Sequence, residues 1–135
     1  MSDLLREISI LVVEDDRDTA ELIQAVLEGS GAVVFVANTV DAAMKQQQQG
    51  PAHVLVSDIR LGSSDGFALI AAIRQHDKEY RGFTPAIALT GYTSPGDEER
   101  AMSAGFNAYM RKPFEPKDLV NTIADLLKRA AQPAA

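Results

Sequence analysis

Apolar residues along this chain gather in five short runs separated by polar or turn-forming segments. The runs are rich in valine, isoleucine, leucine and alanine, and a polar residue stands at or just after the end of most of them. Short apolar runs bounded by turn formers are typical of strands buried on both faces of a parallel sheet. We therefore predict five strands, at residues 8–13, 32–36, 54–58, 85–90 and 108–111.

The segments between these runs carry apolar residues at helical spacing. Ala20 and Ile23 share one face of the first segment, and Leu119 and Ile123 share one face of the last, which is the most amphipathic. Strands that alternate with helices pair in parallel through right-handed crossovers, which predicts an α/β fold with helices on both faces of the sheet. The predicted helices are residues 19–28, 39–49, 67–74, 97–104 and 119–127.

Several polar residues are expected to have only structural roles. Asp15 or Asp16 can cap the first helix, and Thr39, or the asparagine before it, can cap the second. His53 flanks a predicted strand and His76 lies in a polar stretch after the third helical pattern. We expect both histidines to be solvated and assign them no chemistry.

Composition narrows the class of protein. The 135 residues are enough for one domain, and 46% hydrophobic with 24% charged residues is ordinary for a soluble globular chain. A net charge of −6 argues against direct nucleic-acid binding, and the absence of cysteine excludes disulfides and thiol chemistry. No apolar run approaches the roughly 18 residues that span a bilayer. We therefore expect a single cytoplasmic domain over residues 1–135, without membrane contact.

Polar side chains follow four of the predicted strands. Glu14 and Asp15 follow the first, Asp58 ends the third, Thr90 ends the fourth and Lys112 follows the fifth. Because the carboxyl ends of parallel strands meet at one edge of a sheet, we expect these side chains to converge. Clustered carboxylates repel one another, and Mg²⁺ with oxygen ligands relieves that repulsion. A lysine and a hydroxyl suit a phosphoryl group, so the pattern favours nucleophilic attack of Asp58 on phosphorus.

Four segments carry a family resemblance that extends over nearly the whole chain. They are residues 12–15, residues 56–61 with Asp65 and Gly66, residues 89–91 and residues 109–114. In this order and spacing they resemble the receiver domain of two-component response regulators, of the chemotaxis-regulator type. The resemblance implies a doubly wound, flavodoxin-like fold with five parallel strands in the order 2-1-3-4-5.

The resemblance also implies a function for the converging side chains. Asp58 would accept a phosphoryl group from a sensor histidine kinase or a histidine phosphotransfer protein. Thr90 would hydrogen-bond that group and Lys112 would pair with it. The chain would be a switch rather than an enzyme, with only self-phosphorylation from small phosphodonors and autodephosphorylation. The ligands of Mg²⁺ would be Glu14, Asp15, Asp58 and the backbone carbonyl of Arg60.

Further residues would transmit the signal or control access. Tyr109 would be the aromatic residue whose rotamer follows Thr90. The face formed by the fourth helix, fifth strand and fifth helix would signal to a downstream protein. Gly91 is small, which leaves Asp58 accessible, and the peptide bond before Pro113 is expected to be cis.

The sequence departs from the family pattern at a few positions. Glu14 stands where aspartate is more common, which lengthens one metal-binding arm by a methylene group. Gly62 stands where proline is usual and predicts a looser loop. Arg60 and Tyr92 fall at positions that tune the lifetime of the phosphoryl group.

Two other classes of protein share part of this pattern. The segment from Asp16 to Thr19 is similar to the D-x-D-x-T opening of haloacid-dehalogenase phosphohydrolases, but its threonine comes one position early. A flavodoxin-like electron carrier would need a phosphate-binding loop after the first strand, where this chain has Glu14 and Asp15. The carboxylates would repel a flavin phosphate.

Within the receiver interpretation, the context of the domain stays open. The chain carries no output domain after its fifth predicted helix, and it begins with Met1, so we expect a stand-alone receiver domain. The alternative is a receiver excised from a hybrid histidine kinase or a larger regulator.

Overall fold

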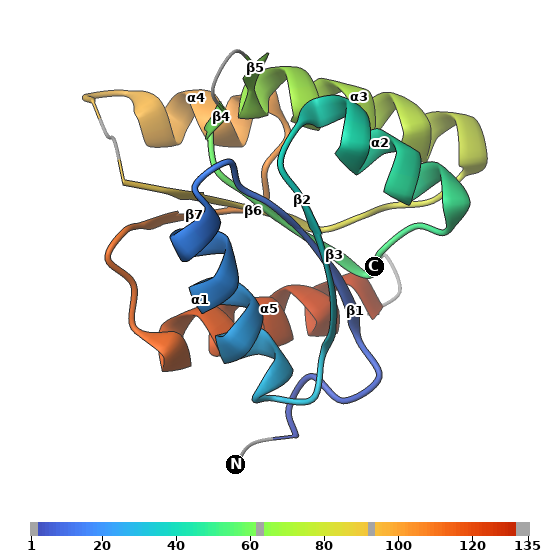
Figure 1. The fold of residues 1–135 in the computed structure, drawn as a ribbon. Coiled ribbons are helices and arrows are strands. Elements are labelled where there is room, and N and C mark those ends of the chain that lie inside the picture. The colour runs from blue at the N-terminus through green and yellow to red at the C-terminus, as the bar shows by residue number, and fades with distance from the viewer. Residues whose placement is uncertain (1–2, 62–63, 92–93, 132–135) are drawn as a thin grey trace.

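The computed structural model describes residues 3–61, 64–91 and 94–131. Gly62 and Tyr92, two of the departures noted above, lie outside the described residues. Figure 1 shows a central twisted sheet between two layers of helices. Within the described residues, no helix has the length and apolar character needed to cross a membrane.

The central sheet has five parallel strands in the order β2-β1-β3-β6-β7. This is the predicted order 2-1-3-4-5, because two further strands outside this sheet, β4 and β5, interrupt the numbering. The predicted fold class is therefore confirmed. The five strands are β1 (Ser9–Val13), β2 (Val33–Ala37), β3 (Val54–Ser57), β6 (Ala86–Thr90) and β7 (Ala108–Arg111).

The interruption is a small antiparallel ribbon that the sequence did not predict. β4 (Arg60–Leu61) pairs with β5 (Ser64–Asp65) directly after the central strand β3. Two-residue strands leave no hydrophobic periodicity, and this segment is rich in turn formers. The sequence therefore predicts only a loop at this segment.

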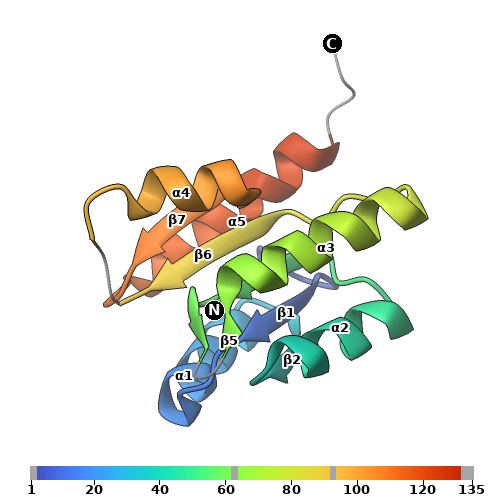
Figure 2. The same cartoon turned by 90° about the horizontal axis from the view of Figure 1, so that it is seen from above.

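Five helices cover the two faces of the sheet (Figures 1 and 2). α1 and α5 pack on one face with a core that includes Ile23 and Ile123. α2, α3 and α4 pack on the other, around Leu69 and Ala101. The helices are α1 (Arg17–Glu28), α2 (Val40–Gln49), α3 (Gly66–Tyr80), α4 (Asp97–Ala104) and α5 (Pro116–Ala131).

Side-chain caps fix where three helices begin. Asp16, one of the two predicted candidates, accepts a hydrogen bond from the Thr19 N–H at 3.0 Å, and its hydrogen bonds with Thr19 lower the pKa of Asp16. Thr39 caps α2 and Asp65 caps α3 in the same way. Because Asp16 is engaged as a cap, Asp15 is the carboxylate left beside Glu14.

The C-terminal half of α3 differs from the expectation. The apolar pattern stops at Arg74, but the helix continues to Tyr80 and buries His76, which is only 7% exposed and stacks on Tyr80 at 4.5 Å. The prediction of a solvated His76 was wrong. His53 has a structural contact, since its Nδ1 accepts a hydrogen bond from the Ser9 N–H at 2.9 Å. The burial of His76 leaves no apolar pattern in the sequence, because the residues around it are polar.

Candidate functional site

The register of the sheet brings the carboxyl ends of β1 and β3 together. Val13 at the end of β1 lies opposite Ser57 at the end of β3. The N–H of Asp58 then donates to the carbonyl of Val13 at 3.0 Å, which fixes the start of the loop after β3. Glu14 and Asp58 are therefore neighbours at the carboxyl edge, as the sequence predicted.

Lys112, directly after β7, joins these two carboxylates. Its ammonium group donates to Oε1 of Glu14 and, at 2.9 Å, to Oδ2 of Asp58. The side chains are 20% exposed for Lys112, 2% for Glu14 and 12% for Asp58. Three charged groups, each following a different strand, thus lie in contact in one largely buried site. An unpaired charge in such a site would destabilise the fold.

Burial controls the electrostatics of this cluster. Burial raises the pKa of Glu14 to about 7, although the hydrogen bond and charge of Lys112 oppose the shift. Burial tends to lower the pKa of Lys112, but its hydrogen bonds to Glu14 and Asp58 outweigh that effect and the pKa of Lys112 is raised. Lys112 therefore stays an ammonium ion, and Glu14 takes up a proton at a higher pH than an ordinary glutamate does.

The backbone around Asp58 orients its carboxylate. Its Oδ1 accepts a hydrogen bond from the Arg60 N–H at 3.1 Å, and the Ser57 hydroxyl donates to the Asp58 carbonyl at 2.8 Å. One carboxylate oxygen therefore contacts Lys112 and the other contacts the Arg60 N–H. The Asp58 side chain is 12% exposed at the carboxyl edge of the sheet, compared with 2% for Glu14.

Gly66, which the sequence alone does not identify as a site residue, supports this geometry. Its N–H donates to the Ile59 carbonyl at 2.6 Å. A Cβ atom at this position would lie 2.5 Å from the Asp58 carbonyl oxygen and 2.8 Å from the Ile59 Cα. Both obstacles are backbone, so a larger residue would displace the chain that carries Asp58. The available signal was the Asp65-Gly66 pair, with a cap residue immediately before a glycine at the start of a helix.

Thr90 and Gly91 lie beside the lysine. Thr90 is 1% exposed at the end of β6, and its carbonyl accepts the backbone N–H of Lys112 at 2.9 Å. A Cβ atom at Gly91 would stand 3.5 Å from the Lys112 side chain, which is an ordinary contact. A larger side chain at Gly91 would therefore project beside Lys112.

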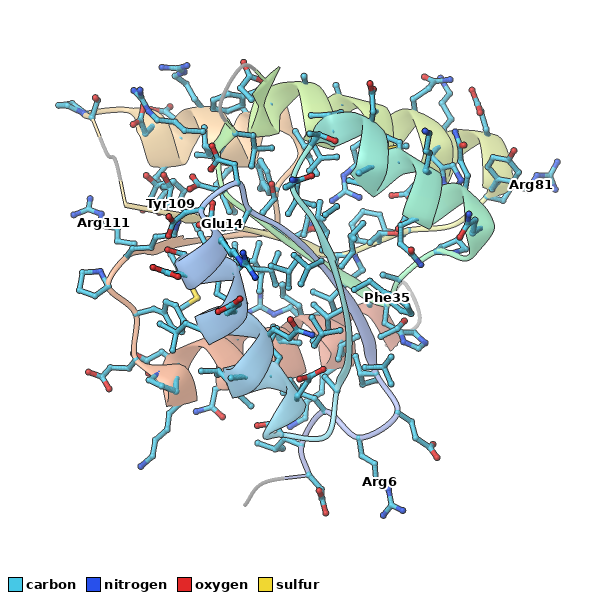
Figure 3. All side chains as sticks on the ribbon, viewed as in Figure 1. Arg6, Glu14, Phe35, Arg81, Tyr109 and Arg111 are labelled. Atoms are coloured by element: carbon cyan, nitrogen blue, oxygen red, sulfur yellow. The ribbon has the colours of Figure 1, made fainter. Side chains whose placement is uncertain are left out.

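Tyr109 lies on β7 at the same end of the sheet as Glu14 (Figure 3). Its ring packs against the core beneath α2, α3 and α4. Its hydroxyl is inaccessible to solvent and has no hydrogen-bond partner among the described residues, and burial raises the pKa of Tyr109. A buried hydroxyl without a hydrogen-bond partner is energetically unfavourable.

The predicted metal ligands are only partly assembled. Glu14 and Asp58 meet through Lys112, whereas Asp15 is exposed. In the part of the chain that the structure describes, no three acidic or histidine side chains form a group that could hold a metal ion. However, Oε2 of Glu14 is buried without a hydrogen-bond partner in that same part. An unsatisfied carboxylate oxygen next to a second carboxylate is a donor set that suits Mg²⁺.

The sequence and fold of this chain match a known class of protein. The response regulator receiver domain family matches residues 10–124 of the chain. The chain belongs to this family, and it is therefore a receiver domain of two-component signalling systems.

Individual relatives agree with this assignment. An uncharacterised 14.6 kDa protein of Leptolyngbya boryana is 40% identical over 88% of this chain and 89% of its own length. The response regulator Rre1 of Synechocystis sp. is 34% identical over 90% of this chain and 52% of its own length. The solved structure of the chemotaxis response regulator CheY4 of Vibrio cholerae superposes with a TM-score of 0.79 at 27% identity, covering 89% of this chain and 98% of that one. The chain thus spans nearly all of one relative and about half of another.

Proposed function

We propose that Asp58 is the phosphoacceptor of a two-component or phosphorelay pathway. The observation that carries the proposal is the placement of its carboxylate. One oxygen contacts the Lys112 ammonium at 2.9 Å and the other contacts the Arg60 N–H at 3.1 Å, at the open edge of the sheet. A carboxylate held next to a fixed cation is oriented for attack on a phosphoryl group whose charge that cation can neutralise.

The reaction transfers a phosphoryl group from a phosphohistidine of the partner. An oxygen of Asp58 forms a bond to phosphorus while the phosphorus–nitrogen bond breaks and the imidazole leaves. Lys112 then pairs with a phosphoryl oxygen in place of the carboxylate oxygen, and the Thr90 hydroxyl donates to another. Hydrolysis of the acyl phosphate by water later returns the carboxylate and releases phosphate.

Mg²⁺ is the cofactor that these oxygen donors fit. We assign it to Glu14, Asp15, Asp58 and the backbone carbonyl of Arg60. When bound, it supplies positive charge that offsets the carboxylates and the incoming phosphoryl group. Glu14 contributes the oxygen that is buried without a partner among the described residues.

The response of the chain would pass through Thr90 and Tyr109 to the face formed by α4, β7 and α5. When Thr90 turns toward the phosphoryl group, space opens for the Tyr109 ring and its hydroxyl can reach a partner. The downstream partner is a protein that distinguishes the two states of this face. The chain acts in the cytoplasm, without direct binding to nucleic acid or membrane.

Incubation with acetyl phosphate and Mg²⁺ tests the assignment of Asp58. Intact-mass spectrometry should show one added phosphoryl group on the wild-type chain and none on the Asp58→Asn variant. Asp65→Asn is the matched control, since Asp65 is a helix cap near the site, and that variant should still be labelled. Labelling of Asp58→Asn to the wild-type level would refute the proposal.

A receiver within a larger regulator or hybrid kinase is the second candidate. The observation that favours it is that the chain corresponds to about half the length of Rre1. The phosphohydrolase alternative is less favoured, because Asp16 is occupied by its hydrogen bonds with Thr19 as a helix cap. Sustained turnover of a generic phosphomonoester would support the phosphohydrolase and contradict the receiver function.

A further inference from the structure

The edge strand β2 has an apolar surface, and within the described residues no strand pairs with its outer side. It pairs with β1 alone, and Figure 2 shows it at the opposite margin of the sheet from β7. Val33, Phe35 and Val36 are 51%, 40% and 43% exposed. Soluble proteins usually protect such edges with charged residues, proline or bulges. No residue from 29 to 40 is charged or a proline, so the sequence of this edge lacks these protections.

The hydrogen-bond pattern identifies which backbone groups face outward. The Val33 N–H donates to the Ile8 carbonyl, and the Ala37 carbonyl accepts the Glu14 N–H. Alternate residues of a strand direct their backbone groups to opposite sides, so Val33, Phe35 and Ala37 bond inward to β1. Val34 and Val36 consequently direct their N–H and carbonyl groups away from the sheet.

These outward groups are complementary to a second copy of the same strand. A two-fold axis at Phe35 places Val34 of one copy opposite Val36 of the other, and the reverse. Each of the two pairs exchanges two hydrogen bonds, as an antiparallel ladder requires. Because this strand is uncharged, its close approach to itself brings no like charges together, although each chain carries a net charge of −6.

The same axis brings the two Phe35 rings together. Phe35 bonds inward, so across the new interface it occupies a non-hydrogen-bonded pair, in which facing Cα atoms are about 4.5 Å apart. Aromatic cross-strand pairs at such positions stabilise a sheet. Phe35 extends from β2 at the edge that faces the viewer in Figure 3. On the opposite face of the strand, Val36 would pack near Val34 of the other copy.

We propose that β2 is a homodimer interface in which two copies of this chain pair antiparallel to form one continuous sheet of ten strands. This association is separate from the phosphoacceptor site, because Asp58 follows β3, two strands inward from β2. An isologous contact of this kind closes on itself and does not propagate into fibres.

A disulfide experiment tests the register directly, because the chain contains no cysteine. In the Phe35→Cys variant the two introduced thiols would face each other at a Cα separation within the range of about 4.4–6.8 Å that a disulfide spans. The matched control is Leu22→Cys, on α1 and 55% exposed. Under mild oxidation, Phe35→Cys should form covalent dimers at least about tenfold faster than the control. Equal rates would overturn the proposal.

Sedimentation equilibrium of the unmodified chain supplies a measurement that depends on no variant. The wild type should shift reversibly from monomer to dimer as its concentration rises. Val36→Lys should remain monomeric, because a charge on the edge opposes pairing, whereas Leu22→Lys should dimerise like the wild type. A wild type that stays monomeric at millimolar concentration, or a dimer that Val36→Lys leaves intact, would contradict the proposal.

Discussion

At the scale of single residues, the electrostatics of the site depend on the joint burial of three charged side chains, those of Glu14, Asp58 and Lys112. Glu14 is nearly inaccessible, and among the described residues its carboxylate forms an ion pair with the Lys112 ammonium, which also pairs with Asp58. Burial therefore dominates the pKa of Glu14, whereas in Lys112 the two carboxylates dominate. The sequence predicted that these residues would meet, because each follows a strand of a parallel sheet. It could not predict that Glu14 would be buried more deeply than Asp58.

Gly66 gives a prediction at this scale. Gly66→Ala should lower the stability of the fold and slow the labelling of Asp58 by acetyl phosphate, because the added methyl group would collide with the Asp58 carbonyl oxygen. Gly50→Ala is the matched control, since a Cβ atom at Gly50 meets nothing within 4 Å. Urea unfolding and the rate of labelling check both effects. If the two variants label at the same rate, the role assigned to Gly66 is wrong.

The pKa of Glu14 gives a second prediction. Its value rises from 4.5 to about 7 on folding, so the folded chain binds more protons between these pH values. The metal-free fold therefore loses stability as pH rises through this window. Glu14→Gln removes that loss, and the stability of this variant relative to the wild type should increase from pH 5 to pH 8.

Urea titrations in the presence of EDTA measure this difference. Asp18→Asn, an exposed position in the first turn of α1, should show no comparable change. A stability difference between Glu14→Gln and the wild type that is constant from pH 5 to pH 8 would contradict the electrostatic account.

At the scale of elements, a network of polar contacts joins α3 to the segments that precede the next two central strands, β6 and β7. Arg74 donates five hydrogen bonds, to the carboxylate of Asp77, the carbonyls of Thr84 and Gly105, and the side-chain oxygen of Asn107. These contacts tie α3 to the segments just before β6 and β7. They lie at the opposite end of the strands from Asp58.

Arg74→Met should therefore destabilise the fold by about 3 kcal/mol, the cost of leaving a buried charge partner and several carbonyls unpaired. Arg17→Met is the control, because Arg17 is 90% exposed and its ion pair with Glu21 should contribute less than about 1 kcal/mol. Urea unfolding of both variants measures the difference. Equal effects of the two substitutions would show that the network does not stabilise the fold.

Lys112 connects the site to β7, which it follows directly, and so to the face that is proposed to signal. Lys112→Ala should still bind Mg²⁺, whose assigned ligands remain, but phosphorylation should change the α4–β7–α5 face less than in the wild type. Hydrogen exchange of α4 and β7 with and without acetyl phosphate measures that response. A response equal to that of the wild type would count against the role of Lys112.

The sequence predicted the elements that have an apolar pattern and missed those that have none. The five central strands were recognisable because each is an apolar run, and their polar ends located Glu14, Asp58, Thr90 and Lys112. The β4–β5 ribbon and the burial of His76 were missed, since two-residue strands and polar helix ends carry no periodic signal.

At the scale of the whole molecule, two regions of one sheet differ in chemical character. The carboxyl edge holds the charged cluster, and the margin at β2 is apolar and uncharged. Because β1 and β3 lie between this margin and β6, the proposed pairing through β2 would not involve the proposed phosphoacceptor Asp58 or the α4–β7–α5 face. Dimerisation through β2 and phosphorylation can therefore occur in the same molecule.

The measurement that tests the central claim most directly is chemical mapping of the phosphorylated residue. After incubation with acetyl phosphate and Mg²⁺, borohydride reduces an acyl phosphate to an alcohol with loss of phosphate, which marks the modified carboxylate permanently. Peptide mass spectrometry should find this mark on Asp58 and should find none in the Asp58→Asn variant. A mark on Glu14 or Asp15 in the wild type, with Asp58 unmodified, would contradict the account.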